Sequence, residues 1–522
     1  MLPPLLEALL EPGCYPHPVG RIELVETHIS WVLLTGEYAY KIKKPVDLGF
    51  LDFSTLAKRR HFCDEELRLN RRLAPQLYLD VVPITESAGT LRIAGGDGEP
   101  IEYAVKMRQF AQDAQLDRVL ARGELRPEHI DSLARELARF HGEILVARPE
   151  TPFGEPAVVL APMRENFEQI RPRVEAGRHG LLAQLERWTA RTYEQLAPVL
   201  AARKREGFVR ECHGDAHLAN MALLEGEVVL FDCLEFNANL RWIDIISELA
   251  FATMDLDDRG RKDLAWRFVN GYLEHTGDYA GVRLLRFYQV YRALVRAKVA
   301  AIRLGQAAIG VTDRTRAEKD LGSYLELAQG YTRTGSSGLL ITHGLSGSGK
   351  TFLTQGLVES LGAIRIRSDV ERKRLQGLSA EARSGSGVAT GLYAESVTRE
   401  TYARLASLAR AVLQGGMTAI VDATFLQAAQ RKAFAELARS LDIPFLVLAT
   451  RATEQTLRAR IATRAVAGRD ASEANLDVLA RQLAGLEPIV GDERELVIEF
   501  DTESLPLSEE IARAVRARLV AT

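Results

Sequence analysis

The sequence is poor in cysteine and contains no long apolar run. Its 522 residues include four cysteines, which are scattered and form no C-x-x-C pair: Cys14, Cys63, Cys212 and Cys233. This usage fits a reducing compartment and offers no zinc site. No run approaches the roughly eighteen uncharged apolar residues of a membrane span. The apolar start of the chain contains prolines and acids but no basic segment, so it is a poor secretory signal.

The sequence also lacks an excess of charge of one sign. Its 67 Lys and Arg residues face 70 Asp and Glu residues, which gives a formal net charge of -3. This balance argues against a surface built for non-specific nucleic-acid binding. The hydrophobic content of 47% is ample for buried cores, and the length suggests about two to four domains. We expect a cytoplasmic protein with no membrane association.

The most specific motif lies at residues 339–351. An apolar run at 339–343 predicts a strand, and the next residues fit the spacing G-x-x-x-x-G-K-[ST]. Glycines let the backbone N–H groups approach a polyphosphate closely, while Lys350 places a charge on the phosphates and the Thr351 hydroxyl can bind Mg²⁺. We interpret the stretch as an ATP-binding P-loop rather than a glycine-rich surface turn. Its glycines are Gly344, Gly347 and Gly349.

Short apolar segments alternate with helical patterns after this motif. They lie at 363–367, 418–422, 444–449 and 496–500. This rhythm predicts an α/β P-loop domain, residues 336–522, whose parallel sheet has helices on both faces. Reactive groups should therefore collect at the carboxyl ends of the strands.

Two acidic residues follow predicted strands of this domain. Asp369 and Arg372 share one face of a helix's first turn, so Asp369 could accept the proton of an acceptor hydroxyl while Arg372 holds the acceptor or a phosphate. The alternative is that Asp369 only interacts with the helix dipole. Asp422 ends the third strand, where an acid commonly supports the Mg²⁺ of a P-loop.

Arginines gather later in the same domain. Arg464, and with less weight Arg460 and Arg469, follow the fourth strand, where a closing lid can supply cations to the transferred phosphate. A solvated helix face is the alternative interpretation. The Ser- and Gly-rich stretch 383–387 is a candidate acceptor loop.

The region before the P-loop contains a second set of reactive residues. A predicted hairpin at 29–43 carries Lys41, which either extends from a sheet edge or faces an anion. Further on, Asp215 precedes Asn220 by five residues, and a short hairpin then ends in Asp232. This order and spacing is the arrangement that phosphoryl transfer needs in a protein-kinase type of fold, with one Asp as base and the Asn and the later Asp on Mg²⁺.

Residues from about 25 to 330 resemble the aminoglycoside phosphotransferase family through these motifs. The resemblance implies a small lobe of sheet plus one helix, a helical lobe, and ATP between them. It assigns Asp215 as catalytic base, His213 as its brace, and Asn220 and Asp232 as metal ligands. We take residues 1–335 as this domain, which ends in the small polar linker 332–338.

The same resemblance assigns the remaining residues of the small lobe. Lys41 matches the lysine that holds the α/β-phosphates, with Lys43 as the alternative, and Glu66 matches its helix partner, with Glu65 as the alternative. Asp244 matches a structural aspartate. The sequence departs from related kinases in two ways. It has no G-x-G-x-x-G loop, and this absence is usual in the aminoglycoside phosphotransferase family. The run 232–237 lacks the familiar glycine after Asp232, and Glu235 in this run could be a further metal ligand or support one.

The second domain resembles P-loop kinases of the adenylate-kinase-like group, which includes zeta toxins and polynucleotide 5′-kinases. The Ser-Asp-x-x-Arg segment at 368–372 and the Val-Asp-Ala-Thr segment at 421–424 look most like the polynucleotide kinase branch. The same segments recur in kinases of small molecules.

Together these patterns predict an α+β protein-kinase-like bilobal domain followed by an α/β P-loop domain. We expect a bifunctional phosphotransferase that uses ATP and Mg²⁺ at two independent sites and transfers phosphate to hydroxyl groups of small molecules. Two alternatives stay open. One is a C-terminal polynucleotide 5′-hydroxyl kinase, although nucleic acid is not the favoured partner, and the other is an ATP-sensing regulatory or toxin-like module.

Overall fold

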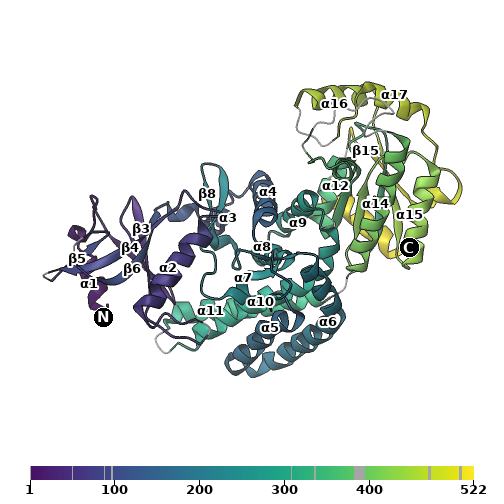
Figure 1. Ribbon diagram of the computed structural model, residues 1–522. Coiled ribbons are helices and arrows are strands. Elements are labelled where there is room, and N and C mark those ends of the chain that lie inside the picture. The colour runs from purple at the N-terminus through teal and green to yellow at the C-terminus, as the bar shows by residue number, and fades with distance from the viewer. Residues whose placement is uncertain are drawn as a thin grey trace. The chain divides into compact units, whose positions relative to one another are not determined.

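An antiparallel sheet of six strands forms the N-terminal part of the chain (Figure 1). It is seen in a computed structural model that describes residues 2–521 except 50, 88, 96–97, 307–308, 334, 336, 381, 383–393, 468–471 and 505–507. The strand order is β1-β2-β3-β6-β4-β5. The strands are β1 (Glu23–Glu26), β2 (Ser30–Leu34), β3 (Tyr38–Lys43), β4 (Tyr78–Ser87), β5 (Thr90–Ile93) and β6 (Pro100–Arg108).

The predicted hairpin is confirmed, and its second strand is not an edge strand. β2 and β3 pair antiparallel around Gly36, whose φ of 100° is a conformation that favours glycine. β3 also pairs with β6 on its other side, which excludes the interpretation of Lys41 as a lysine that extends from a sheet edge. Tyr40 and Ile42 belong to a buried cluster with Leu6 and Leu9 of helix α1 (Pro4–Leu9). The lysines of β3 therefore face the other side of the sheet, where helix α2 (Leu56–Asn70) lies.

The part of the chain that follows is mainly helical and contains two pairs of short antiparallel strands. Strands β8 (Met221–Leu224) and β9 (Glu227–Leu230) form one hairpin, and β7 (Val209–Glu211) pairs with β10 (Trp242–Asp244). Neighbouring helices are α3 (Leu116–Ala121), α4 (Pro127–Glu143), α5 (Pro156–Ile170), α6 (His179–Arg205) and α8 (Ile245–Asp258). The hairpins place the segment 211–220 and the segment 231–235 beside each other.

A five-stranded parallel sheet forms the C-terminal part (Figure 1). Its order is β12-β13-β11-β14-β15, and all four pairings are parallel. The strands are β11 (Leu339–His343), β12 (Ile364–Arg367), β13 (Ala419–Asp422), β14 (Phe445–Arg451) and β15 (Val497–Asp501), at the predicted positions. The α/β prediction for this part is therefore confirmed.

Helices cover both faces of the parallel sheet. Helices α12 (Lys350–Leu357) and α18 (Ser508–Ala521) bury Leu353 and Val515 against Leu340 and Leu446 of the sheet. α14 (Glu395–Gln414) and α15 (Ala428–Ser440) pack on the same strands outside this cluster. The remaining helices of this part are α13 (Ser368–Leu375), α16 (Glu454–Ala467) and α17 (Leu476–Ala484).

The chain divides into two compact units. The first comprises Met1–Leu133, Arg139–Pro162 and Ala197–Ala252, and the second comprises Ala134–Ala138, Met163–Leu196 and Thr253–Thr522. The second unit therefore includes, besides the parallel sheet, parts of α5 and α6 and the whole of α9 (Lys262–Thr276), α10 (Val282–Leu304) and α11 (Val311–Thr332). Each helix in the described part of the chain is too short or too polar to span a bilayer.

Candidate active sites

The first candidate site is built on the lysine of β3. Lys41 Nζ lies 2.8 Å from Glu66 Oε1 and 2.5 Å from Asp232 Oδ1. Glu66 comes from α2 and is fully buried. Burial opposes the charge of Lys41, but Asp232 and Glu66 outweigh it and raise the pKa of the ammonium well above its ordinary value. Glu65 lies elsewhere, against Arg68 and Arg241. Glu66 is therefore the residue that contacts the lysine.

A second lysine binds the same glutamate. Lys43 Nζ lies 2.7 Å from Glu66 Oε2, and it also contacts the Glu235 carboxylate. Burial opposes ionisation of Glu66, yet Lys41 and Lys43 outweigh it and lower its pKa to about 2. Glu235 has a raised pKa because it is buried. The sequence left Lys41 and Lys43 as alternatives, whereas the structure joins both to one carboxylate and places Glu235 on Lys43.

The predicted catalytic loop is tightly bonded. Asn220 Nδ2 donates to Asp215 Oδ2 at 2.9 Å and to the Asp215 carbonyl at 3.1 Å. The Asp215 backbone N–H donates to His213 Nδ1 at 3.3 Å, so the other ring nitrogen of His213 carries the hydrogen and donates to the Phe231 carbonyl at 2.8 Å. His213 thus links the Asp215 loop to the segment that carries Asp232.

Asp232 adopts an unusual backbone conformation. Its φ is 64°, a left-handed value that costs a non-glycine residue energy unless its surroundings hold it. The Asp232 N–H donates to the Tyr78 hydroxyl at 3.1 Å, and the next N–H donates to Asn70 Oδ1 at 2.9 Å. The Phe231 N–H donates to the Asn220 carbonyl at 2.9 Å, so Asn220 and Asp232 flank the same end of the β8–β9 hairpin. Their oxygens are of the kind that Mg²⁺ prefers.

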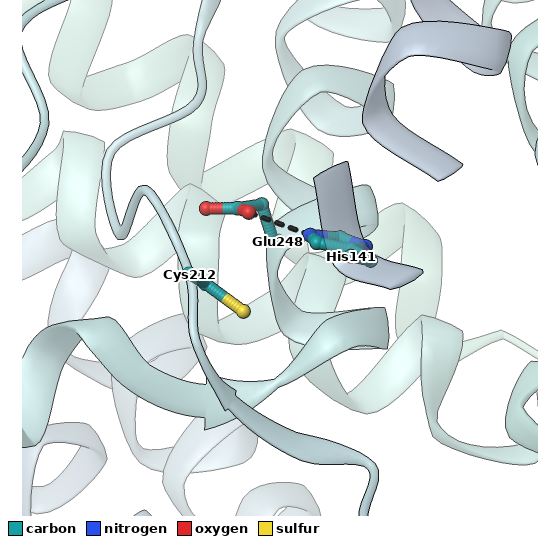
Figure 2. A group of neighbouring side chains, drawn as sticks. All are labelled: His141, Cys212 and Glu248. Carbon is teal, nitrogen blue, oxygen red and sulfur yellow. Dashed lines mark hydrogen bonds and ion pairs between the residues drawn. The ribbon is translucent and has the colours of Figure 1, made fainter. Parts of the chain in front are cut away.

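The buried pair of His141 and Glu248 supports this loop (Figure 2). Glu248 Oε1 accepts the Gly214 N–H at 2.7 Å, and Glu248 Oε2 lies 2.7 Å from His141 Nε2. Gly214 has a φ of 89°, and a Cβ there would meet the Leu240 carbonyl at 3.0 Å, so the loop needs a glycine. Cys212 completes a group whose ligand atoms lie within 4.8 Å of one another. Because both Glu248 oxygens already have partners, we interpret the group as a brace for the Asp215 loop and not as a metal site.

Sequence reasoning missed Glu248. The only signal is that Glu248 lies among apolar residues near the start of α8, whereas the other acids of this helix lie at its end; this predicts a buried partner but not its identity. Asp244, expected to be structural, contacts Arg203 at 2.7 and 3.0 Å and accepts the Ile246 N–H at 2.9 Å. These contacts join α6 to the start of α8 and leave Asp244 no role in chemistry.

The second candidate site is the loop between β11 and α12. Gly344, Gly347 and Gly349 have φ values of 152°, 82° and 85°, which side chains would strain. Lys350 bends over the loop and donates to the carbonyls of Gly344 at 3.0 Å and Leu345 at 2.8 Å. In the described part of the chain its ammonium contacts no carboxylate, and burial lowers its pKa to about 8.

Oxygen ligands for a metal lie beside the loop. Thr351 Oγ1 donates to Asp422 Oδ2 at 2.9 Å, and Thr354 Oγ1 lies 3.4 Å from the same oxygen. Asp422 ends β13 and is buried. A hydroxyl and a carboxylate are hard ligands that suit Mg²⁺, so this pair fits the metal that the motif implies.

Asp369 and Arg372 form a pair in α13. Arg372 Nη1 donates to Asp369 Oδ1 at 3.2 Å. Burial opposes ionisation of Asp369, but Arg372 outweighs it and holds the pKa of the carboxyl below its ordinary value. The residue also lies in the helix's first turn, so its interaction with the helix dipole is compatible with the same position.

Two of the three predicted lid arginines lie in the described chain. Arg464 donates to the Ala474 carbonyl at 2.9 Å. Arg460 contacts the P-loop itself, through the Gly347 carbonyl at 3.3 Å, and also Thr502 Oγ1 at 2.8 Å. Arg469 and the stretch 383–387 lie outside the described residues.

These groups line one cavity of about 640 Å³. It also contains three residues that sequence reasoning missed: Arg367, Arg481 and Gln482. Gln482 Oε1 accepts the Ser346 N–H of the P-loop at 2.8 Å. Arg367 could have been found from its position at the carboxyl end of a strand, whereas α17 gives no sequence signal for Gln482 or Arg481.

The fold and the two sites define a protein with two kinase-like domains. The chain matches the phosphotransferase enzyme family model over residues 53–285 and the AAA domain model over residues 339–489. The first match covers the helix and loops around Asp215, and the second covers the P-loop. The predicted resemblance to a phosphotransferase-type domain followed by a P-loop kinase domain is therefore confirmed.

Relatives with the same architecture occur in mycobacteria. The chain is 31% identical over 475 residues to the uncharacterized protein Rv2004c of Mycobacterium tuberculosis. The matched region covers 90% of this chain and 92% of the relative. The uncharacterized protein Mb2027c of Mycobacterium bovis gives the same values. This chain belongs to the same family as these two proteins.

Two solved kinase structures each resemble one part of the chain. The amicoumacin kinase hAmiN, in complex with AMP-PNP, Ca²⁺ and Ami, is 12% identical and covers 62% of this chain and 92% of its own, with a TM-score of 0.39. A gluconokinase from Sinorhizobium meliloti 1021 is 22% identical and covers 36% of this chain and 94% of its own, with a TM-score of 0.24.

Proposed function

We propose that this protein is a bifunctional ATP- and Mg²⁺-dependent phosphotransferase, with one site in residues 1–335 and another in residues 336–522. The observation that carries the proposal is that each region contains its own phosphate-binding cation, oxygen ligands for Mg²⁺ and a carboxylate that can accept a proton. In the first region these are Lys41, Asn220, Asp232 and Asp215, and in the second they are Lys350, Thr351, Asp422 and Asp369.

At the first site the carboxylate of Asp215 accepts the proton of the acceptor hydroxyl. Lys41, held by Glu66, binds the α- and β-phosphates of ATP, and Asn220 and Asp232 hold Mg²⁺. Mg²⁺ held there would offset negative charge on the phosphates. His213 keeps the Asp215 loop and the Asp232 segment in register through its two hydrogen bonds.

At the second site the backbone N–H groups of the P-loop and the charge of Lys350 bind the polyphosphate. Thr351 and Asp422 hold Mg²⁺. Asp369 accepts the acceptor's proton and Arg372 orients the acceptor, while Arg464 and Arg460 bring positive charge to the transferred group.

Small molecules are the acceptors that the second cavity suits best, because its volume of about 640 Å³ is that of a small-molecule site. One observation favours a second candidate, a polynucleotide 5′-hydroxyl kinase. Five arginines line this cavity: Arg367, Arg372, Arg460, Arg464 and Arg481. The four cysteines are buried and none of them forms a disulfide, which supports action in the reducing cytoplasm.

Transfer from γ-labelled ATP to a metabolite extract tests the proposal. Asp215→Asn should abolish one set of labelled products, Lys350→Ala should abolish a different set, and the double variant should form none. A general base contributes about 10²- to 10⁴-fold, so the loss caused by Asp215→Asn should be of this size. Matched controls are Asp64→Asn and Lys432→Ala, which change exposed residues of the same two types. If neither active-site substitution alters any transfer, the proposal is wrong.

A second measurement separates the acceptor classes. A single-stranded oligonucleotide with a 5′-hydroxyl should remain unlabelled if the second site acts on small molecules. Labelling that depends on Lys350 and weakens with added salt would favour the polynucleotide kinase. Binding of ATP at either site without any product would indicate a regulatory module instead.

A further inference from the structure

The first strand after the P-loop, β12, lies at the end of the parallel sheet, so among the described residues one of its edges has no neighbouring strand. Exposed strand edges carry unpaired N–H and C=O groups. Here the side chain of Asn270, from helix α9, forms hydrogen bonds with backbone groups of this edge. Asn270 Nδ2 donates to the Ala363 carbonyl at 3.0 Å, and the Arg365 N–H donates to Asn270 Oδ1 at 2.7 Å. One amide side chain thus makes the two bonds that a strand would make.

Helix α9 contributes to the core of the P-loop part as well. Trp266 packs against the buried cluster formed by the sheet, α12 and α18. A Cβ at Gly362 would lie 2.6 Å from Trp266 Nε1, so the chain approaches the indole as closely as a glycine permits. Arg267 contacts Glu359 at 2.9 Å. These residues belong to the stretch that matches the phosphotransferase family model, yet they pack on the parallel sheet.

The last turn of α9 reaches the second candidate site. Glu274 Oε1 lies 2.7 Å from Arg365, and Glu274 Oε2 lies 3.4 Å from Arg367. Burial opposes ionisation of Glu274, but the two arginines outweigh it and hold the pKa of the carboxyl below its ordinary value. Arg367 lines the cavity together with Lys350 and Asp369. A carboxylate from α9 therefore fixes an arginine that faces the phosphate-binding cavity.

We propose that helix α9 belongs functionally to the P-loop kinase domain. Its residue Asn270 closes the edge of the sheet, and its residue Glu274 is a positioning residue that holds Arg367 toward the transferred phosphate. The inference rests on the proposed function of the second site for the role of Arg367, and on contacts alone for the role of Asn270. It means that the second site depends on a segment that precedes the P-loop by more than sixty residues.

The test uses the full chain carrying Asp215→Asn, so that only the second site turns over. The readouts are ADP release from Mg·ATP with water as acceptor and the Kd of a fluorescent ATP analogue. Glu274→Gln should lower kcat about tenfold and change the Kd less than about twofold, because an arginine used only during transfer acts on kcat. Asp263→Asn is the matched control, since Asp263 lies on the same helix and pairs with Arg261 instead.

A double-mutant cycle distinguishes positioning from general support. Arg367→Gln should lower kcat as much as Glu274→Gln does, and the double variant should be no worse than either, because both remove one interaction. If Glu274→Gln behaves like Asp263→Asn, or if the two effects add, the positioning role is wrong.

Hydrogen exchange tests the sheet edge without any turnover. Asn270→Ala should speed the exchange of amides in residues 363–367 relative to Asp263→Asn, and unchanged exchange there would overturn the role of α9. If Lys350→Ala leaves ADP release unaltered, the proposed function of the second site fails, whereas the exchange of 363–367 still decides whether α9 closes the sheet.

Discussion

The two candidate nucleotide sites place positive charge in physically different ways. In the first, Lys41 and Lys43 share the two oxygens of Glu66, and each also contacts a second carboxylate, Asp232 or Glu235. In the second, Lys350 contacts two loop carbonyls, and a loop of this kind presents backbone N–H groups to an anion. The lysines of the first site are therefore held by ion pairs that join distant segments, whereas the lysine of the second site is held by its own loop.

This difference should appear most strongly in stability. Lys43→Met leaves Glu235 as a buried carboxylate without its cation, and breaking a buried pair costs about 3–5 kcal/mol. We expect a loss of this size in the free energy of unfolding of the first unit, measured by urea titration with hydrogen exchange of the β3 amides as the probe.

Two lysines serve as comparisons for this experiment. Lys44→Met, next along the chain, removes a contact with the exposed Glu26 and should cost less than about 1 kcal/mol. Lys350→Met removes a buried charge whose bonds are to carbonyls and should leave the second unit at least as stable. A loss for Lys350→Met as large as that for Lys43→Met would remove the distinction between the sites.

The pH dependence of nucleotide binding should separate the sites next. A lysine is charged below its pKa, and the pKa of Lys350 is about 8. Affinity at the second site should therefore be highest well below pH 8 and should fall as the pH rises through that value, by about tenfold between pH 7 and pH 9. At the first site the pKa of Lys41 is raised and that of Glu66 is lowered to about 2, so affinity should stay within about twofold.

Variants with one intact site allow this measurement. Lys41→Ala leaves the second site and Lys350→Ala leaves the first, and a fluorescent ATP analogue reports the Kd of each across the pH range. An equal pH dependence in both variants would contradict the comparison.

The smallest expected effect concerns the brace of the P-loop. Gln482→Ala removes the acceptor of the Ser346 N–H, and a hydrogen bond of this kind contributes about 0.5–1.5 kcal/mol. We expect a few-fold weaker binding of the ATP analogue to the second site and no change at the first. Gln430→Ala, which changes a glutamine lining the same cavity, is the control. Full binding by Gln482→Ala would show that the loop holds its shape through its glycines alone.

The contrast between the sites also explains what could be read from sequence. The P-loop, its glycines and the parallel strands follow local patterns, and the structure has them at the predicted positions. The choices between Lys41 and Lys43 and between Glu66 and Glu65 in the first site could not be made from local patterns. Lys41 and Lys43 lie on the same face of one strand, and the neighbours Glu65 and Glu66 differ only in helix phase, so local pattern could not choose between them. Packing of α2 on the sheet turns Glu66 inward and leaves Glu65 on Arg68 and Arg241.

Three residues that sequence reasoning missed, Glu248, Gln482 and Asn270, have partners far away along the chain. Glu248 bonds His141, 107 residues earlier, and Ser346 bonds Gln482, 136 residues later. Asn270 bonds Arg365 at a separation of 95 residues. A polar residue in a helix looks alike in sequence whether it meets solvent or a buried backbone group, because burial is set by the packing of whole elements.

Short-range chemistry thus already specified the kinds of site in this chain: a glycine loop with its lysine, a base five residues before an asparagine, and strands that alternate with helices. The folded chain added the assignments that depend on long-range contact. It joined both lysines to Glu66, placed Glu248 against the Asp215 loop, and brought α9 to the edge of the parallel sheet. The physical reason is that backbone geometry and hydrogen bonding act over a few residues, whereas burial and ion pairing act between surfaces that meet only after folding.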